Sequence, residues 1–575
     1  MGQGRRALSM KRREFLGAMA GAAALAGCDS RSPIEGGFAG IDVESGHRLR
    51  QPFGGRQAAS GGPARRVRVL IAGGGVAGLA AARSLRLAGI EDFCLLDLEA
   101  EAGGNSRGGA IGGIAHPLGA HYLPVPGDHA HEVQDLLEEF GLRSRVSGRW
   151  RYDERHLCHS PQERLFFRGA WQDSLLPQGD VGAATRDQYR RFAAEVEAVR
   201  RALPFRIPTL RASRLDGLLE LDALPFGRWL DQRGLDDQHL RWYLSYCCRD
   251  DYGAGVAHVS AWAGLHYFAA RHGFRAPGDG APDVTAGASA EAETEPVLTW
   301  PEGNAWLTRR LSRPLGDRLQ VRQLVTQIVD TRSQVEVESL DLASGQTRRW
   351  VADRCIVALP TFVAARVVHG PPAALVSAAG QLRHAPWLVA NVHLKAPLAV
   401  GPGAAPAWDN VLYGARGLGW VDARHQSLDP TPGPTVLSWY RALGPGTDVA
   451  LPADGNGSGS AGGDGNGNGN GNGNGDQDTD ARRQLLERPW SSWRDEMLAE
   501  LSIPHPDLPA LATRIDITRY GHAMAIPSPG TLARLGIHSR ITAGRLAFAH
   551  GDWSGYSIFE EAFTRGHLAG EWAAT

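Results

Sequence analysis

The glycines Gly73, Gly75 and Gly78 recur with the spacing G-x-G-x-x-G directly after an apolar run. In such a loop the first glycine permits a tight turn, the second lets the backbone approach a pyrophosphate, and the third lets helix and strand pack closely. N–H groups at the start of the following helix then hold the phosphate charge. Asp97 follows Gly78 by 19 residues, where an acid accepts a ribose hydroxyl. These residues predict a dinucleotide site.

The flanking sequence supplies the elements that such a site requires. Residues 67–72 predict a buried strand, residues 79–87 predict a helix that Gly89 ends, and a second strand ends at Asp97. The stretch GSGSAG at 457–462 also fits the glycine pattern, but no strand precedes it and no helix follows it. We therefore place the dinucleotide site at residue 73.

Three further motifs follow in order along the chain. Gly103 and Gly104 come six and seven residues after Asp97, a strand series ending in ALP occupies 321–360, and a GD…GY…E block lies at 551–561. Together with the glycine loop, these motifs resemble those of the flavin-containing amine oxidase superfamily. The resemblance covers most of residues 65–575.

By this resemblance the cofactor is FAD. Gly103 and Gly104 are expected beside the flavin, Val325 is expected to meet the adenine through its backbone, and Gly551 and Asp552 are expected by the ribityl-phosphate portion. No second strand–glycine–helix unit is apparent for a nicotinamide cofactor. Electrons are therefore expected to come from the substrate and to leave to oxygen, a quinone or a carrier.

The expected fold class is α/β, with a Rossmann-like FAD-binding domain assembled from discontinuous segments and an inserted α+β substrate domain. The FAD-binding domain is expected to comprise 65–145, 296–375 and 511–575, and the substrate domain 146–295 and 376–510. Residues 29–64 are rich in Gly, Arg, Ser and Pro and predict a flexible tether. The Gly/Asn-rich residues 454–480 predict a disordered loop.

The residues expected to face the substrate are His522, Tyr556 and His121. DWSGY at 552–556 resembles the segment of monoamine oxidases that supplies one aromatic wall of the substrate cage, so Tyr556 is expected to line the cavity. The alternative is a core tyrosine that packs the last helix. His121 matches a segment that passes near the flavin in relatives.

RYGHAMAIPSPG aligns with the monoamine oxidase segment that carries the covalent flavin cysteine and the other cage aromatic. His522 and Ala523 occupy those two positions, which excludes a thioether link to the flavin there and leaves the cage half complete. His522 is expected to act as a base or an electrostatic partner, or else to cap a strand in the core.

Charged residues near the reacting side offer further hints. Family amine oxidases commonly place a lysine near the flavin, but the matching strand holds Val389 and Asn391, and Lys395 comes too late. Oxygen is therefore not expected to be the best electron acceptor. Asp250 and Asp251 could attract a cation such as a polyamine, although a surface position is the commoner explanation for such a pair.

The overall composition excludes some classes of function. The 575 residues carry a formal net charge of -1, so no basic balance points to nucleic acid. Six cysteines show neither CxxC spacing nor a Cys/His cluster, and we predict no metal site.

The N-terminus has the parts of an export signal. RRxFL at 12–16 resembles a twin-arginine signal, and LAGC, which ends at Cys28, resembles a lipobox. Residues 1–28 are therefore expected to address the chain to the twin-arginine export machinery, with a lipid on Cys28 anchoring it at the periplasmic side of the inner membrane. An ordinary basic N-terminus followed by an alanine-rich helix is the alternative.

The resemblance and the predicted export signal together imply an exported oxidoreductase that oxidises an amine, such as a polyamine, or a related small organic substrate by hydride transfer to noncovalent FAD. One alternative is a desaturase or isomerase acting on an apolar, membrane-derived substrate. Another is a non-catalytic flavin-binding protein at the membrane. The sequence leaves these alternatives open.

Overall fold

The computed structural model describes residues 33–50, 63–158, 162–213, 216–271, 273–277, 296–425, 427, 429, 431–448, 474–535 and 541–575. The predicted signal at 1–28, with Cys28, lies outside these residues. No helix among the described residues has both the length and the apolar character needed to cross a bilayer.

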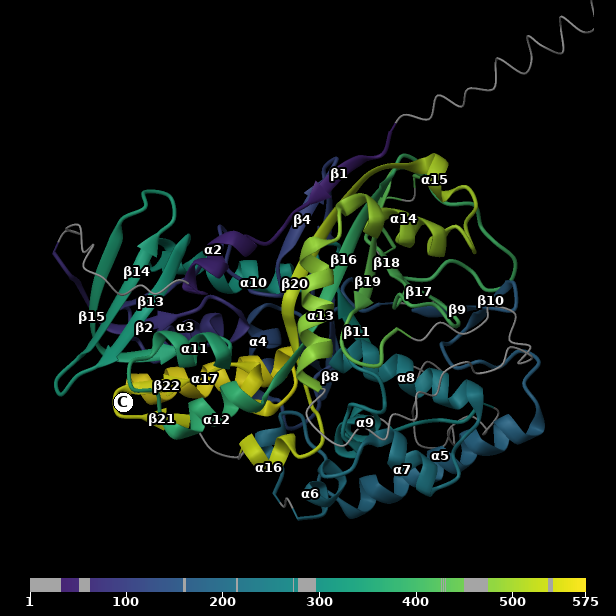
Figure 1. Cartoon of the computed structure of the whole chain (residues 1–575), viewed down its shortest axis with the longest axis horizontal. Helices are drawn as coiled ribbons and strands as arrows, with labels where there is room; N and C mark the ends of the chain where they lie inside the picture. The colour runs from purple at the N-terminus through teal and green to yellow at the C-terminus, as the bar shows by residue number, and fades with distance from the viewer. Residues whose placement is uncertain are drawn as a thin grey trace, which may run out of the picture.

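Two large sheets organise the molecule (Figure 1). The first has the order β12-β3-β2-β15-β14-β13, and β22 also pairs with β15. Its strands are β2 (Arg65–Ala72), β3 (Phe93–Leu96), β12 (Leu319–Gln320), β13 (Gln323–Asp330), β14 (Val335–Asp341), β15 (Thr347–Val357), β21 (Ile541–Ala543) and β22 (Leu546–Phe548). The pairs β12–β3, β3–β2, β2–β15 and β15–β22 are parallel, whereas β13, β14 and β15 form an antiparallel meander and β21 pairs antiparallel with β22.

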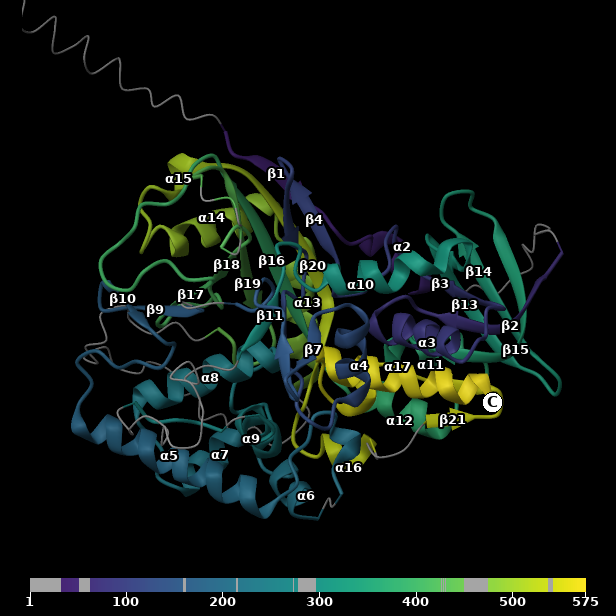
Figure 2. The ribbon, with the colours of Figure 1, turned by 180° about the vertical axis from the view of Figure 1, so that it is seen from behind.

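β3, β22 and the carboxyl-terminal parts of β2 and β15 are buried apolar runs, as is usual when helices cover a sheet. The helices of this part are α3 (Val76–Leu87), α4 (His131–Glu139), α10 (Ala305–Ser312), α11 (Thr361–Val367), α12 (Ala373–Gln381) and α17 (Phe559–Ala574). Viewed from behind, α3, α4 and α17 lie together at this sheet (Figure 2). Segments from the start, middle and end of the chain therefore share one core.

The second sheet has the order β1-β20-β16-β19-β18-β17-β9-β10. Its strands are β1 (Glu35–Phe38), β9 (Glu163–Phe167), β10 (Ala170–Asp173), β16 (Arg383–Leu394), β17 (Asp409–Leu412), β18 (Trp420–Asp422), β19 (Thr435–Ala442) and β20 (Ala512–Ile526). The long strands β16 and β20 pair over most of their length. Because β16 and β19 are buried on both faces, they carry few alternating polar residues.

Helices complete the part of the molecule around the second sheet. They are α5 (Ala183–Ala202), α6 (Asp216–Asp222), α7 (Phe226–Gln232), α8 (Gln238–Tyr252), α9 (Ala261–Ala269), α13 (Asn474–Glu487), α14 (Trp490–Leu501), α15 (Leu508–Leu511) and α16 (Thr531–Leu535). Smaller strands are β4 (Gly108–Ile111) with β5 (Ile114–Pro117), β6 (Tyr122–Pro124) with β11 (Val297–Thr299), and β7 (Arg143–Val146) with β8 (Arg149–Tyr152). The predicted α/β class is confirmed.

Two segments differ from their predicted flexibility. Within the expected tether 29–64, residues 35–38 form β1, Val43–His47 form α2, and Arg48–Arg50 form a single turn of 3-10 helix. Composition missed this order because β1 is held by backbone hydrogen bonds to β20, which need no apolar side chain. Within the expected loop 454–480, residues 474–480 begin α13, and residues 454–473 lie outside the described part.

Candidate active site

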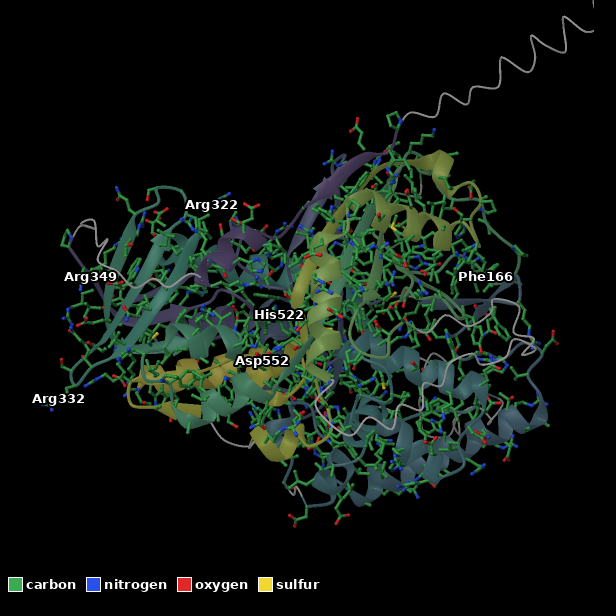
Figure 3. The ribbon with its side chains drawn as sticks, in the orientation of Figure 1. Phe166, Arg322, Arg332, Arg349, His522 and Asp552 are labelled. Atoms are coloured by element: carbon green, nitrogen blue, oxygen red, sulfur yellow. The ribbon has the colours of Figure 1, made fainter. Side chains whose placement is uncertain are left out.

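One cavity of about 880 Å³ is lined by residues from both sheets. It reaches from the carboxyl ends of β2 and β3 to β16, β19 and β20. Figure 3 shows the labelled His522 and Asp552 close together near the middle of the molecule, and both line this cavity. A volume of this size is typical of a ligand site.

The glycine loop forms one end of the cavity. Gly73 has φ +103°, and a Cβ there would lie 2.3 Å from the carbonyl oxygen of Ala358, so only glycine fits. Gly75 is the N-cap of α3 and lines the cavity, and no side chain caps this helix end. Gly78 is buried in α3, where a Cβ would lie 1.9 Å from the carbonyl oxygen of Gly73. The open N-terminus of α3 therefore offers N–H groups to an anion.

Asp97 fixes the loop from the neighbouring strand. Its Oδ2 accepts a 2.8 Å hydrogen bond from the N–H of Gly74, and its Oδ1 accepts one of 2.8 Å from the N–H of Glu99. Burial raises the pKa of Asp97 to about 6, although these two hydrogen bonds oppose the rise. Because Asp97 also lines the cavity, its carboxylate lies where a ribose hydroxyl could donate to it.

A second glycine pair faces the loop. The N–H of Gly103 donates to the carbonyl of Gly74 over 2.8 Å. Gly104 has φ +58°, and its Cβ would lie 3.2 Å from the Cα of Gly75. Like the glycine loop, this side of the cavity therefore presents backbone without side chains. Val325, on β13, also lines the cavity.

Asp552 is almost fully buried and joins three segments of the cavity wall. Its Oδ2 accepts hydrogen bonds from Thr361, one from the N–H at 2.8 Å and one from the hydroxyl at 3.0 Å. Its Oδ1 lies 3.1 Å from Nε2 of His384. Although burial would raise it, the pKa of Asp552 lies well below its ordinary value because His550 and His384 face the carboxylate. Gly551, the preceding residue, lines the same cavity.

His522 lies on the cavity wall near this carboxylate. Its ring centroid is 4.4 Å from that of Phe362 and 6.0 Å from that of His384. Burial, followed by the charge of Arg482, lowers the pKa of His522 to about 3. The imidazole is therefore neutral at ordinary pH and too weakly basic to hold a proton there.

His121 also lines the cavity. Its ring stacks on Tyr440 with centroids 4.4 Å apart and an interplanar angle of 28°. Burial lowers the pKa of His121 to about 3, although a hydrogen bond with the Gly119 backbone opposes the fall. His121 therefore contributes a neutral aromatic surface.

Tyr556 does not lie where the sequence analysis expected it. It is 1 % exposed, is absent from the cavity lining, and packs between Trp262 and His266. Its hydroxyl donates a 2.7 Å hydrogen bond to Glu561, in the first turn of α17. The expected cage wall is thus corrected to the core tyrosine that was the alternative, because the buried Glu561 requires hydrogen-bond donors.

Other aromatic residues line the substrate side instead. Tyr440 and Tyr520 line the cavity, and their hydroxyls donate to the carbonyls of Gly119 and Leu118 over 3.0 and 2.9 Å. Trp387, on β16, joins them. The sequence analysis missed Tyr520 and Trp387. A usable signal was that Tyr520 stands two residues before His522 on one strand, since alternate residues share a face.

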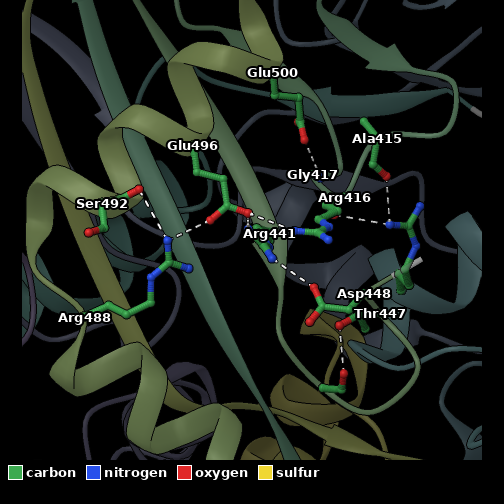
Figure 4. Close-up of polar contacts among 12 residues, drawn as sticks. Ala415, Arg416, Gly417, Arg441, Thr447, Asp448, Arg488, Ser492, Glu496 and Glu500 are labelled. Atoms are coloured by element: carbon green, nitrogen blue, oxygen red, sulfur yellow. Dashed lines mark hydrogen bonds and ion pairs between the residues drawn. The ribbon is translucent and has the colours of Figure 1, made fainter. Parts of the chain in front are cut away.

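The strand that carries Tyr440 is held from its other face. Its neighbour Arg441 points to α14 and pairs with Glu496, and it also lies 3.0 Å from Asp448 (Figure 4). Glu496 also forms an ion pair with Arg488, whose Nη2 lies 3.0 Å from Oε2 of Glu496. Arg441 is buried, whereas its partners Glu496 and Asp448 are partly or largely exposed. Because successive side chains alternate across a strand, these ion pairs hold one face of β19 while Tyr440 faces the cavity.

Two acidic residues at the end of α8, Asp250 and Asp251, line the same cavity. Burial raises the pKa of Asp250 to about 7, and the adjacent Asp251 raises it further, whereas Arg249 opposes the rise. These carboxylates are therefore part of the site and not the surface pair that composition made the commoner explanation. Within the described residues no group of three or more His, Cys, Asp or Glu side chains could hold a metal ion.

Comparisons with known proteins agree with this arrangement. A family model described as flavin-containing amine oxidoreductase matches residues 76–438. Among curated proteins, none matches the chain. A solved structure of wild-type putrescine oxidase bound to putrescine is 16% identical, with a TM-score of 0.61, and the match covers 88% of this chain and 99% of that chain.

Two further solved structures are similar. Cyclohexylamine oxidase from Brevibacterium oxydans IH-35A is 15% identical, with a TM-score of 0.59, over 88% of this chain and 98% of that chain. A CLA-producing fatty acid isomerase from P. acnes is 13% identical, with a TM-score of 0.53, over 87% of this chain and 97% of that chain. Likeness at such identities shows the fold, whereas the family model spans more than half of the chain. This protein belongs to the flavin-containing amine oxidoreductase family.

Proposed function

We propose that this protein binds FAD noncovalently and oxidises an amine, with di- and polyamines as the first substrates to test. The observation that carries the proposal is that Asp250 and Asp251 line the same cavity as the glycine loop and Asp97. A cationic amine that entered the cavity would meet these carboxylates. The bare backbone at Gly75 and Gly104 and the open helix end fit the pyrophosphate of a dinucleotide.

When bound, FAD supplies a two-electron acceptor for a hydride from the substrate. The protein's own residues hold the amine and exclude water. Tyr440, Tyr520 and Trp387 supply the aromatic sides of the cavity. Because His121 and His522 are neutral, neither repels a cationic substrate. A cation beside Asp250 would favour the ionised carboxylate and draw its pKa down from about 7.

Val389 lines the cavity on β16, where family amine oxidases commonly carry a lysine. Lys395 follows the end of β16 and is not among the lining residues. These positions support a quinone or protein carrier as a faster electron acceptor than oxygen. Stopped-flow reoxidation of the reduced flavin by a soluble quinone and by air-saturated buffer tests this, and faster reoxidation by air would contradict it.

A second candidate function is isomerisation or desaturation of an apolar, membrane-derived substrate. The neutral aromatic lining around His121 and Tyr440 favours it, as does the likeness to the fatty acid isomerase. Anaerobic flavin bleaching separates the candidates. Bleaching by putrescine or spermidine supports amine oxidation, and bleaching by isoprenoids or fatty acids alone supports the second candidate. Because isomerisation leaves the flavin oxidised, product analysis accompanies the bleaching measurement. A protein that neither shows bleaching nor converts any of these compounds would point to a non-catalytic flavin-binding protein.

We also propose that the protein is exported by the twin-arginine machinery and anchored by a lipid on Cys28 at the periplasmic side of the inner membrane. The support is the order of the RRxFL and LAGC motifs. Labelled palmitate should be incorporated into the full chain and not into a Cys28→Ala variant. Replacing Arg12 and Arg13 by lysine should leave the flavoprotein in the cytoplasm, and unchanged export would contradict the proposal.

A further inference from the structure

The segment that precedes the glycine loop forms part of the cavity wall. Residues 33–50, called the N-terminal strap below, contribute Ile41, Asp42, Gly46, His47 and Arg50, among others, to the lining. They lie beside the segment that carries Asp97, since a Cβ at Gly46 would be 3.8 Å from Leu98, the neighbour of Asp97. The strap therefore forms the part of the cavity wall beside the end of β3 and Asp97.

The strap is tied to the second sheet at its start. β1 pairs in parallel with β20 from Glu35↔Arg514 to Phe38↔Ile517, and the N–H of Ala39 donates to the carbonyl of Ile517 over 2.9 Å. Arg519, itself a cavity residue, stacks over the ring of Phe38 at 3.6 Å. β20 is also the strand that carries Tyr520 and His522.

Its middle is tied to the first sheet. The N–H of Asp42 donates to Oε1 of Glu99 over 3.3 Å, and the N–H of Glu99 donates to Asp97. The side chain of Asp42 caps α2 by accepting from the N–H of Ser45 over 2.9 Å. Ile41 packs against the main apolar core. The strap is thus linked through one residue to the acid expected to hold the ribose.

Its end is tied to α11. Nη2 of Arg366 donates to the carbonyl of Arg50 over 3.0 Å, and Leu49 packs against the apolar core. α11 begins at Thr361, whose N–H and hydroxyl both bind Asp552. Three separate ties therefore connect the strap to three elements that wall the cavity.

We propose that the N-terminal strap is a cofactor-retaining element that completes the FAD site and tightens the binding of FAD. The inference rests on the proposed binding of FAD. A segment held at both ends is already ordered before the ligand binds, so little ordering entropy is spent on closing the site. A dinucleotide enclosed on this side can leave only when the strap detaches from at least one of its ties.

Adjacent glycines in β1 give a matched pair of variants. Gly36 has φ +132°, and a Cβ there would lie 1.9 Å from the carbonyl oxygen of Ile515, so Gly36→Val must push β1 away from β20. A Cβ at Gly37 meets nothing within 4 Å, so Gly37→Val makes the same chemical change without displacing the strand. Both variants are made in the full chain.

The measurement is the FAD dissociation constant, from quenching of FAD fluorescence by apoprotein, together with the FAD content as purified. Gly36→Val should weaken FAD binding at least about tenfold, which corresponds to about 1.4 kcal/mol. Gly37→Val should bind as the wild type does. Equal affinities for Gly36→Val and the wild type would overturn the proposal.

A measurement on the wild type keeps the test valid where Gly36→Val does not fold. Amide hydrogens of residues 41–50 should exchange at least about tenfold more slowly in the FAD-loaded protein than in the apoprotein. Identical exchange rates in the FAD-loaded protein and the apoprotein would overturn the proposed role of the strap, but not the proposed binding of FAD. A wild type that takes up no FAD would instead overturn the proposed function, on which the strap depends.

Discussion

His384 and Asp552 are 168 residues apart in the chain, yet Nε2 of His384 lies 3.1 Å from Oδ1 of Asp552. The other carboxylate oxygen is occupied by two hydrogen bonds from Thr361. One buried carboxylate, in the short 3-10 helix Gly551–Ser554 before α17, therefore joins this helix to the start of β16 and the start of α11. Each of these segments contributes to the cavity wall.

Asp552→Ala should destabilise the protein and lower its FAD content. The substitution leaves the N–H of Thr361 and the ring of His384 without their buried acceptor, which costs on the order of 1–3 kcal/mol. Urea unfolding and the flavin-to-protein absorbance ratio measure the two effects. Asp552→Asn, which keeps the shape and one acceptor oxygen, should lose less. An Asp552→Ala protein with wild-type stability would contradict this role.

Tyr556→Phe should affect stability and leave catalysis nearly unchanged. The hydroxyl bonds Glu561 in the core and does not reach the cavity, so its loss should cost about 1 kcal/mol of unfolding free energy and change kcat by less than about twofold. Tyr440→Phe is the comparison at a cavity position. A large fall in kcat for Tyr556→Phe at unchanged stability would place Tyr556 beside the substrate.

Asp250 should make stability depend on pH. Its pKa is about 7 in the folded protein against 3.8 in the unfolded chain, so its stabilising contribution is complete below 3.8 and is lost as the pH rises through 7. Asp250→Asn lacks this ionisation. The unfolding free energy of Asp250→Asn minus that of the wild type should therefore increase by on the order of 1–3 kcal/mol from about pH 5 to about pH 8. Urea unfolding at both pH values checks this, and a constant difference would contradict it.

The same ionisation should appear in substrate binding. Because ionised Asp250 attracts a cationic amine, the KM for that amine should fall as the pH rises through about 7. In Asp250→Asn this part of the pH dependence should disappear, whereas an uncharged substrate should show none of it in either protein. A wild-type KM that does not change near pH 7 would remove Asp250 from the binding site.

His522→Gln should leave the pH profile of kcat/KM unchanged in shape. With a pKa of about 3, His522 does not titrate across the range in which activity is measured, and it adds no limb to the profile. Glutamine is a polar side chain of similar length. Any change in the maximum value of kcat/KM therefore reflects altered contacts of this side chain and not the loss of a titrating group. A profile limb present in the wild type and absent in His522→Gln would identify His522 as a titrating base.

Features that depend on residues close together in the sequence were predictable, whereas those that depend on distant residues were not. Gly73, Gly75 and Asp97 belong to a strand–loop–helix–strand unit, and local backbone requirements dictate glycine and an acid at fixed spacing. Their meeting at one cavity end was therefore predictable from the sequence. Tyr556 was not, because the motif around it is equally compatible with a cavity wall and with the core. Only the buried Glu561 decided between them.

The sequence by itself determined the α/β class, the family and the glycine-lined end of the site, because each depends on residue types at short spacing. Only the tertiary structure decided that residues 33–50 are ordered, that Asp250 faces the cavity, and that Tyr440 and Tyr520 replace Tyr556 there. These outcomes depend on which distant strands pair and which strand face is enclosed. Such pairing is set by the free energy of the whole fold and leaves no mark in local composition.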